Sequence, residues 1–180
     1  MDTITRSDFS NWCAKRGLEV VDREWPRYRD AGRHSFLLKL PELPYRSVAL
    51  ARMCFPGTYD ESFKGAMVWI REWGIWTEID EATAMYVIEQ LRAAHGRTEP
   101  LIESPGHVFS QSEFVDARAF WTWPMIVGWD AILFPEAADY FVFNSHDEVV
   151  CFVARTKEKY GLLLNEFKDW KPEETEWYFR

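Results

Sequence analysis

The sequence lacks the segments that direct a protein into or across a membrane. No apolar run in its 180 residues approaches the length that spans a bilayer. Residues 1–9 are polar and mixed in charge, without the basic and apolar regions of a signal peptide. We therefore expect a cytoplasmic protein that does not bind membranes.

Cysteines are few and widely separated. Cys13, Cys54 and Cys151 include no C-x-x-C pair, whereas disulfide frameworks and zinc sites usually need an even number of cysteines or close pairs. Their neighbours are apolar, which is typical of buried free thiols. The sequence therefore predicts neither disulfides nor a cofactor.

Motifs for nucleotide binding and for nucleophilic catalysis are also missing. The nine glycines form no G-x-G-x-x-G and no G-x-x-x-x-G-K-[S/T] loop, and no G-x-S-x-G elbow occurs. None of the three cysteines has a sequence context that suggests activation. These absences remove the usual sequence evidence for nucleotide-dependent enzymes and for serine or cysteine hydrolases.

Basic residues are almost absent from one long stretch. Residues 99–150 contain nine acidic side chains and a single base, Arg118, so this stretch alone matches the net charge of −8. Such a field repels nucleic acid and anionic membranes, and it attracts a basic protein surface. The simpler alternative is a solvated acidic face that keeps the protein soluble.

The pattern of apolar residues predicts a mixture of helices and strands. Helices are expected at 7–17, at 81–95, from 110 to about 121, and after Thr156. Strands are expected at 18–21, 34–40, 46–55, 66–76 and 75–79, and loops at 22–33 and 97–107.

The C-terminal third is the most regular part of the chain. Three apolar segments at 129–134, 140–143 and 149–154 are joined by short connections, which favours an antiparallel meander. The helix after Thr156 carries an apolar stripe that can cover one face of this meander. We expect one α+β domain over residues 1–180, with a mainly antiparallel sheet and about four helices; the alternative is two small α+β halves meeting near 97–108.

Aromatic residues are abundant, with ten Trp, seven Tyr and 13 Phe. So many rings either fill an unusually aromatic core or line a surface that meets a partner. In the expected strand 66–76, period two places Trp69, Arg71 and Trp73 on one face, where the guanidinium can lie between two rings. The candidate binding surface is this row together with residues of the acidic stretch, namely Trp121, Trp123, Trp129, Asp130 and Glu136.

The candidate catalytic residues lie in one predicted turn, at His146, Asp147 and Glu148. A histidine beside carboxylates is the usual material for acid/base catalysis or for a metal site, and His107 could supply a second imidazole. Neither histidine has the spacing of a metal-ligand motif. An ordinary hairpin turn is the alternative interpretation.

These observations favour a non-enzymatic, cytoplasmic protein-binding domain with an acidic, aromatic surface that meets a basic protein surface. An immunity or antitoxin-like protein is one concrete form. Two alternatives stay open: a small metal-dependent or acid/base enzyme using His146, Asp147 and Glu148, and a domain that binds a carbohydrate-like small ligand. Nucleic acid is not expected as a partner because the basic groove it needs is missing.

Overall fold

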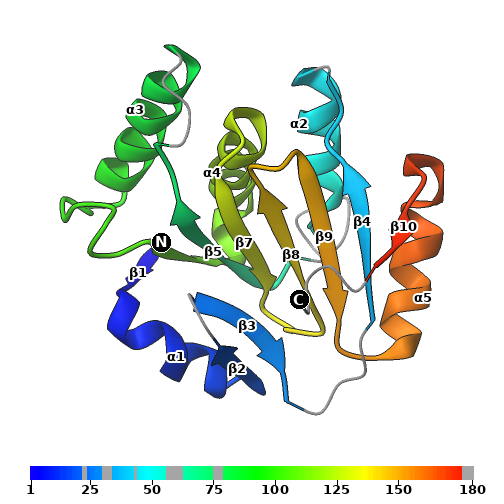
Figure 1. Ribbon diagram of the computed structural model, residues 1–180. Helices are drawn as coiled ribbons and strands as arrows, with labels where there is room; N and C mark the ends of the chain where they lie inside the picture. The colour runs from blue at the N-terminus through cyan, green and yellow to red at the C-terminus, as the bar shows by residue number, and fades with distance from the viewer. Residues whose placement is uncertain (22–23, 30–33, 43, 56–62, 75–78, 176–180) are drawn as a thin grey trace.

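The protein has an α+β fold built on one large antiparallel sheet (Figure 1). The computed structural model describes residues 1–21, 24–29, 34–42, 44–55, 63–74 and 79–175. In these ranges it contains five α-helices, an eight-stranded sheet and a two-stranded hairpin. The expected α+β class with a mainly antiparallel sheet is confirmed.

The eight strands lie in the order β1-β6-β5-β7-β8-β9-β4-β10, and every neighbouring pair is antiparallel. The sheet therefore combines strands from both sides of residues 97–108. Their bounds are β1 (Asp2–Ile4), β4 (Ser35–Lys39), β5 (Gly65–Glu72), β6 (Gly106–Ser110), β7 (Asp130–Pro135), β8 (Tyr140–Ser145), β9 (Val149–Ala154) and β10 (Glu173–Glu174).

Helices cover one face of the sheet, and a helix with a hairpin covers the other (Figure 1). The helical face is covered by α2 (Pro44–Met53), α3 (Ile79–Ala94), α4 (Phe114–Val127) and α5 (Lys157–Glu166). The hairpin face is covered by α1 (Arg6–Ala14) and the hairpin of β2 (Leu18–Val21) and β3 (Trp25–Tyr28). None of the described helices is both long and apolar enough to cross a membrane.

Both faces of the central strands are buried, which explains the high aromatic content. All six residues of β7 and of β8 are buried, so each strand contributes side chains to two cores. On the helical face, Phe36 stacks on Phe152 at 4.8 Å between ring centroids. On the hairpin face, Phe9 stacks on Trp69 at 3.9 Å. Two cores of this kind use far more ring surface than one.

The expectation that the tryptophans form an exposed surface is wrong for three of the five candidate rings. Trp69, Trp121 and Trp129 are fully buried. Trp73 and Trp123 are partly buried and pack against the core of the helical face. The rings are buried because the sheet is covered on both sides, a condition that alternation along one strand does not reveal.

The predicted Trp-Arg-Trp row does not exist, because β5 is irregular near its end. The pairing of β5 with β7 shifts between Ile70 and Glu72, so Arg71 is an extra residue in the strand. Trp69 therefore lies in the core of the hairpin face and Trp73 in that of the helical face. Gly106 on β6 gives the Trp69 ring its space, since a Cβ at this glycine would lie 2.8 Å from the ring.

Several element predictions need correction. Residues 46–55 were expected to form a strand, but α2 spans most of them, with Ser47, Leu50 and Ala51 buried at helical spacing. The expected loop at 22–33 contains β3. Pro26 lies within this strand and is tolerated there because β3 belongs to a two-stranded hairpin, in which both strands are edges. Of the expected strand at 75–79, residues 75–78 lie outside the described residues and Ile79 begins α3.

The sequence predicted that the helix starting near residue 110 ends at about 121, before Pro124. Helix α4 instead continues to Val127. Pro124 has no backbone N–H to donate, yet the last turn of α4 stays helical, with Trp121, Pro124 and Met125 buried. The helix stops at Gly128, which adopts the left-handed conformation at φ 67° and donates its N–H to the Pro124 carbonyl. The predicted capping box between Ser110 and Glu113 is confirmed.

Replacing Trp69 by alanine should lower the free energy of unfolding by about 3–5 kcal/mol, because the variant loses a fully buried ring and retains a cavity. Urea denaturation followed by circular dichroism measures this change. The matched control is Tyr86→Ala, which removes a ring that is 62% exposed and should change stability by less than about 0.5 kcal/mol. Equal effects of the two substitutions would contradict the burial of Trp69.

Candidate functional site

A buried carboxylate, Asp130, organises the charged residues at one end of the sheet. It is the first residue of β7, and its side chain is only 3% exposed. Asn144 on β8 fixes the preceding segment, because its side-chain amide donates to the carbonyls of Pro124 and Trp129. The backbone that carries Asp130 is therefore fixed by contacts between β8 and the end of α4.

Asp130 binds one basic side chain on each side. Its Oδ2 accepts a hydrogen bond from Arg71 Nη1 at 2.8 Å. Its Oδ1 lies 2.8 Å from His146 Nδ1 and accepts the His146 backbone N–H at 2.9 Å. A buried carboxylate needs such partners, since an uncompensated charge in this position is costly.

The bulge in β5 brings Arg71 to this carboxylate. The Arg71 guanidinium also lies over the ring of Trp25, 4.4 Å from its centroid. Trp25 in turn contacts Phe143 edge to face at 4.5 Å, so the ring is anchored on β8. The arginine is thus held by an ion pair and by an aromatic ring on two separate elements.

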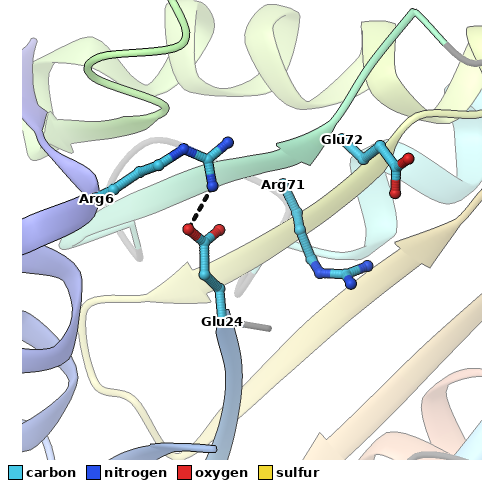
Figure 2. Close-up of a pocket in the computed structure, with 4 residues that line it drawn as sticks. All are labelled: Arg6, Glu24, Arg71 and Glu72. Atoms are coloured by element: carbon cyan, nitrogen blue, oxygen red, sulfur yellow. Dashed lines mark hydrogen bonds and ion pairs between the residues drawn. The ribbon is translucent and has the colours of Figure 1, made fainter. Parts of the chain in front are cut away.

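A cavity of about 230 Å³ lies beside this ion pair, and we call it the charged pocket. It is lined by Arg6, Glu24, Arg71 and Glu72 (Figure 2). Arg6 belongs to the first turn of α1, Glu24 precedes β3, and the other two residues end β5. The pocket therefore forms where three distant parts of the chain meet.

Both arginines of the pocket are already paired with carboxylates. Arg6 forms an ion pair with Glu24, drawn as a dashed line in Figure 2. Glu24 also accepts the indole N–H of Trp69 at 3.1 Å. Glu72 is exposed and forms no ion pair with any residue that the structure describes. The available charge of the pocket is therefore negative.

His146 stands beside the pocket and is surrounded by carboxylates. Burial lowers the pKa of its imidazole, but the hydrogen bond and charge of Asp130, with the charges of Asp147 and Glu72, outweigh this effect. The pKa of His146 is therefore raised above the ordinary value. Asp147 and Glu72 act on this histidine, and Glu148 follows Asp147 in the same turn. All three side chains are exposed, and we call them the acidic rim.

The rest of the acidic stretch does not form one face. Glu136 lies at the other end of β7, where it pairs with Arg16, and Asp139 pairs with Lys159. Other acids of the stretch have partners elsewhere: Glu99 with Arg92, and Glu113 and Asp116 with His95. The predicted grouping of Glu136 with Asp130 is wrong, because residues six apart on a strand lie at its opposite ends.

The second candidate metal ligand, His107, is a core residue. It is fully buried on β6, and its ring lies 2.7 Å from Arg92 Nη1 and 3.1 Å from the Pro105 carbonyl. Burial, together with the Arg92 charge, lowers the pKa of His107 to about 3. Its surroundings favour a neutral structural imidazole, far from His146 in the fold.

Metal-binding and thiol chemistry find little support in the described part of the chain. No group of three His, Cys, Asp or Glu side chains there is placed to hold a metal ion. All three cysteines are buried, and burial raises the pKa of Cys13 and of Cys54 to about 12. Thiols in this state are poor nucleophiles.

The site thus combines predicted and unpredicted residues. Trp69, Arg71, Asp130 and His146 were singled out from the sequence. The fold joins Arg71, Asp130 and His146 through direct contacts, whereas Trp69 is linked to the pocket through its hydrogen bond to Glu24. Arg6, Glu24 and Glu72 were missed. In the sequence, these three residues differ from others only in being charged and lying near the end of a strand. Many charged residues do so, and this feature therefore cannot identify a site.

The chain matches no family model, no curated protein and no solved structure. The function of the charged pocket must therefore be inferred from its own geometry and charges.

Replacing Asp130 by asparagine should lower the free energy of unfolding by about 3–5 kcal/mol, because Arg71 and His146 lose their shared buried counter-charge. Denaturant titration measures the loss. Asp147→Asn is the control: its side chain is 64% exposed, and the expected change is below about 0.5 kcal/mol. A stable Asp130→Asn variant would show that the carboxylate does not organise this end of the sheet.

The stability of the protein should depend on the ionisation of His146. Because its pKa is raised in the folded state, the stabilisation is complete below the unfolded-state value of about 6.5 and is lost as the pH rises through the folded-state value. The variant His146→Gln should therefore differ from wild type more at about pH 5.5 than at about pH 9. Unfolding free energies at the two pH values test this, and an equal difference at both would contradict it.

Proposed function

We propose that the protein is a non-catalytic, cytoplasmic protein-binding domain that captures a basic surface of a partner protein through its acidic rim and charged pocket. The observation that carries this proposal is the distribution of paired and available charge. The arginines of the pocket are bound to carboxylates, whereas Glu72 pairs with no described residue and the rim acids are exposed.

The net charge supports the same choice of partner. At −8 the protein attracts basic proteins over long distances, and the rim provides a local focus for that attraction. Acids elsewhere in the 99–150 stretch are largely compensated by their own arginine, lysine or histidine partners. An immunity or antitoxin-like protein, which neutralises a basic toxin by covering its surface, is the concrete form that fits these charges.

The charged side chains of the site are also held in place by neighbouring residues, as a preorganised binding site requires. Asp130 is held on two sides, and Arg71 is fixed between this carboxylate and the Trp25 ring. A surface held on strands in this way presents its charges with little loss of conformational entropy on binding.

A second candidate function is acid/base catalysis by His146. It is favoured by the buried Asp130 that orients the imidazole through Nδ1, an arrangement that leaves Nε2 on the half-exposed side. Among the described residues, however, the charged group beside His146 Nε2 is the Asp147 carboxylate, at 3.7 Å, which is not a hydroxyl or thiol that the imidazole could activate. A carbohydrate site is less well supported, because the Trp25 ring beside the pocket is covered by Arg71.

The proposal predicts that charge reversal at the rim abolishes partner capture. Wild-type protein should retain a specific basic protein from an extract of its native cell, and the double variant Glu72→Lys/Asp147→Lys should not. Raised salt should weaken capture by the wild type, because the attraction is screened.

The control is Glu103→Lys, which reverses an exposed acid that forms no ion pair with a described residue and lies outside the rim. This variant should capture the partner as well as the wild type does. Equal capture by the rim variant, or the absence of any protein that binds specifically, would refute the proposed function.

A further inference from the structure

We infer that the charged pocket receives a single lysine or arginine side chain, whose cationic end pairs with Glu72. This inference rests on the proposed function and names the group that enters the site. The occupant is thus a monovalent organic cation on a flexible apolar stem, carried by the partner.

The size of the cavity selects a side chain rather than a metabolite. Pockets for drug-sized ligands enclose roughly 300–1,000 Å³. The charged pocket is a shallow depression of about 230 Å³ that is open to solvent, so it offers less space than a pocket that encloses a nucleotide or an oligosaccharide. One extended amino-acid side chain is the kind of group that a space of this size can accept.

The charges select a cation. Both guanidinium groups of the pocket already have a carboxylate partner, Glu24 for Arg6 and the buried Asp130 for Arg71, so an entering anion would meet charges that are already compensated. A cation displaces no existing pair, because Glu72 has no ion-pair partner among the described residues. In the view of Figure 2, the Arg6–Glu24 pair and Glu72 lie on either side of Arg71, so the two carboxylates border the same space.

His146 should compete with the entering cation. The groups that face it are Asp130 on β7, Asp147 on its own turn and Glu72 on β5, with Arg71 on the far side of Asp130. A protonated imidazole there weakens the pull of Glu72 on a second cation. Binding therefore expels a proton, and affinity for the cation rises as the pH increases through the pKa of His146.

Small probes test the pocket without the partner. N-acetyl-lysinamide and N-acetyl-argininamide are titrated into the 180-residue protein, and N-acetyl-norleucinamide serves as the neutral analogue. The indole N–H resonance of Trp69, which is hydrogen-bonded to Glu24, reports on the pocket in ¹H–¹⁵N spectra. Both cations should shift this resonance saturably, and the neutral analogue should not.

The variant Glu72→Gln should weaken cation binding by about tenfold, and Glu103→Gln should leave it within about twofold of wild type. His146→Gln should remove most of the pH dependence. Equal binding of the neutral analogue, or unchanged affinity in Glu72→Gln, would overturn the inference.

The two proposals can fail separately. If Glu72→Gln captures the partner normally while reversal of Asp147 and Glu148 abolishes capture, the pocket inference is wrong and the proposed function stands. If the cations bind in the pocket but no protein is captured, the proposed function is wrong and the pocket inference stands. Circular dichroism of each variant verifies that the fold is intact before either result is interpreted.

Discussion

The charged end of the sheet depends on one buried carboxylate. Asp130 satisfies its charge with Arg71 on one side and with His146 on the other, and it thereby joins the irregular end of β5 to the turn between β8 and β9. Without Asp130, the Arg71 guanidinium would lose the ion pair that helps to hold it over the Trp25 ring. The turn that contains His146 would lose its hydrogen bonds to β7. The pocket is a consequence of this pairing, since Arg71 forms one of its walls.

A second constraint is that the sheet is covered on both faces, by four helices on one side and by α1 with the hairpin on the other. The aromatic surplus follows from it. Rings such as Trp69 and Trp121 fill two separate cores, so their number reflects the architecture rather than a surface for recognition. We propose instead that recognition uses the charged residues at one end of the sheet.

The sequence predicted the elements whose apolar pattern is regular, and it failed where tertiary contacts decide. The segments at 129–134, 140–143 and 149–154 correspond to β7, β8 and β9 because each is short, apolar and bounded by turn residues. Helix α2 was mistaken for a strand because its helical period shows only in which positions are buried, namely Ser47, Leu50 and Ala51. In the site, Arg71, Asp130 and His146 were recognised as candidates, but their pairing depends on a strand register and a bulge that no local pattern encodes. Arg6, Glu24 and Glu72 were missed for the same reason.

The order of strands in the sheet has a consequence for how the chain folds as it is synthesised. In the large sheet, β5, β7 and β8 each pair with the strand that follows directly in the chain, whereas β4 must wait for β9, and β1 must wait for β6. Ser35 finds its partner Val153 only after residues 36–152 have been synthesised. Until then, the apolar strand β4 has neither of its sheet neighbours, β9 and β10. We therefore expect β4 to be the segment where aggregation competes most directly with folding.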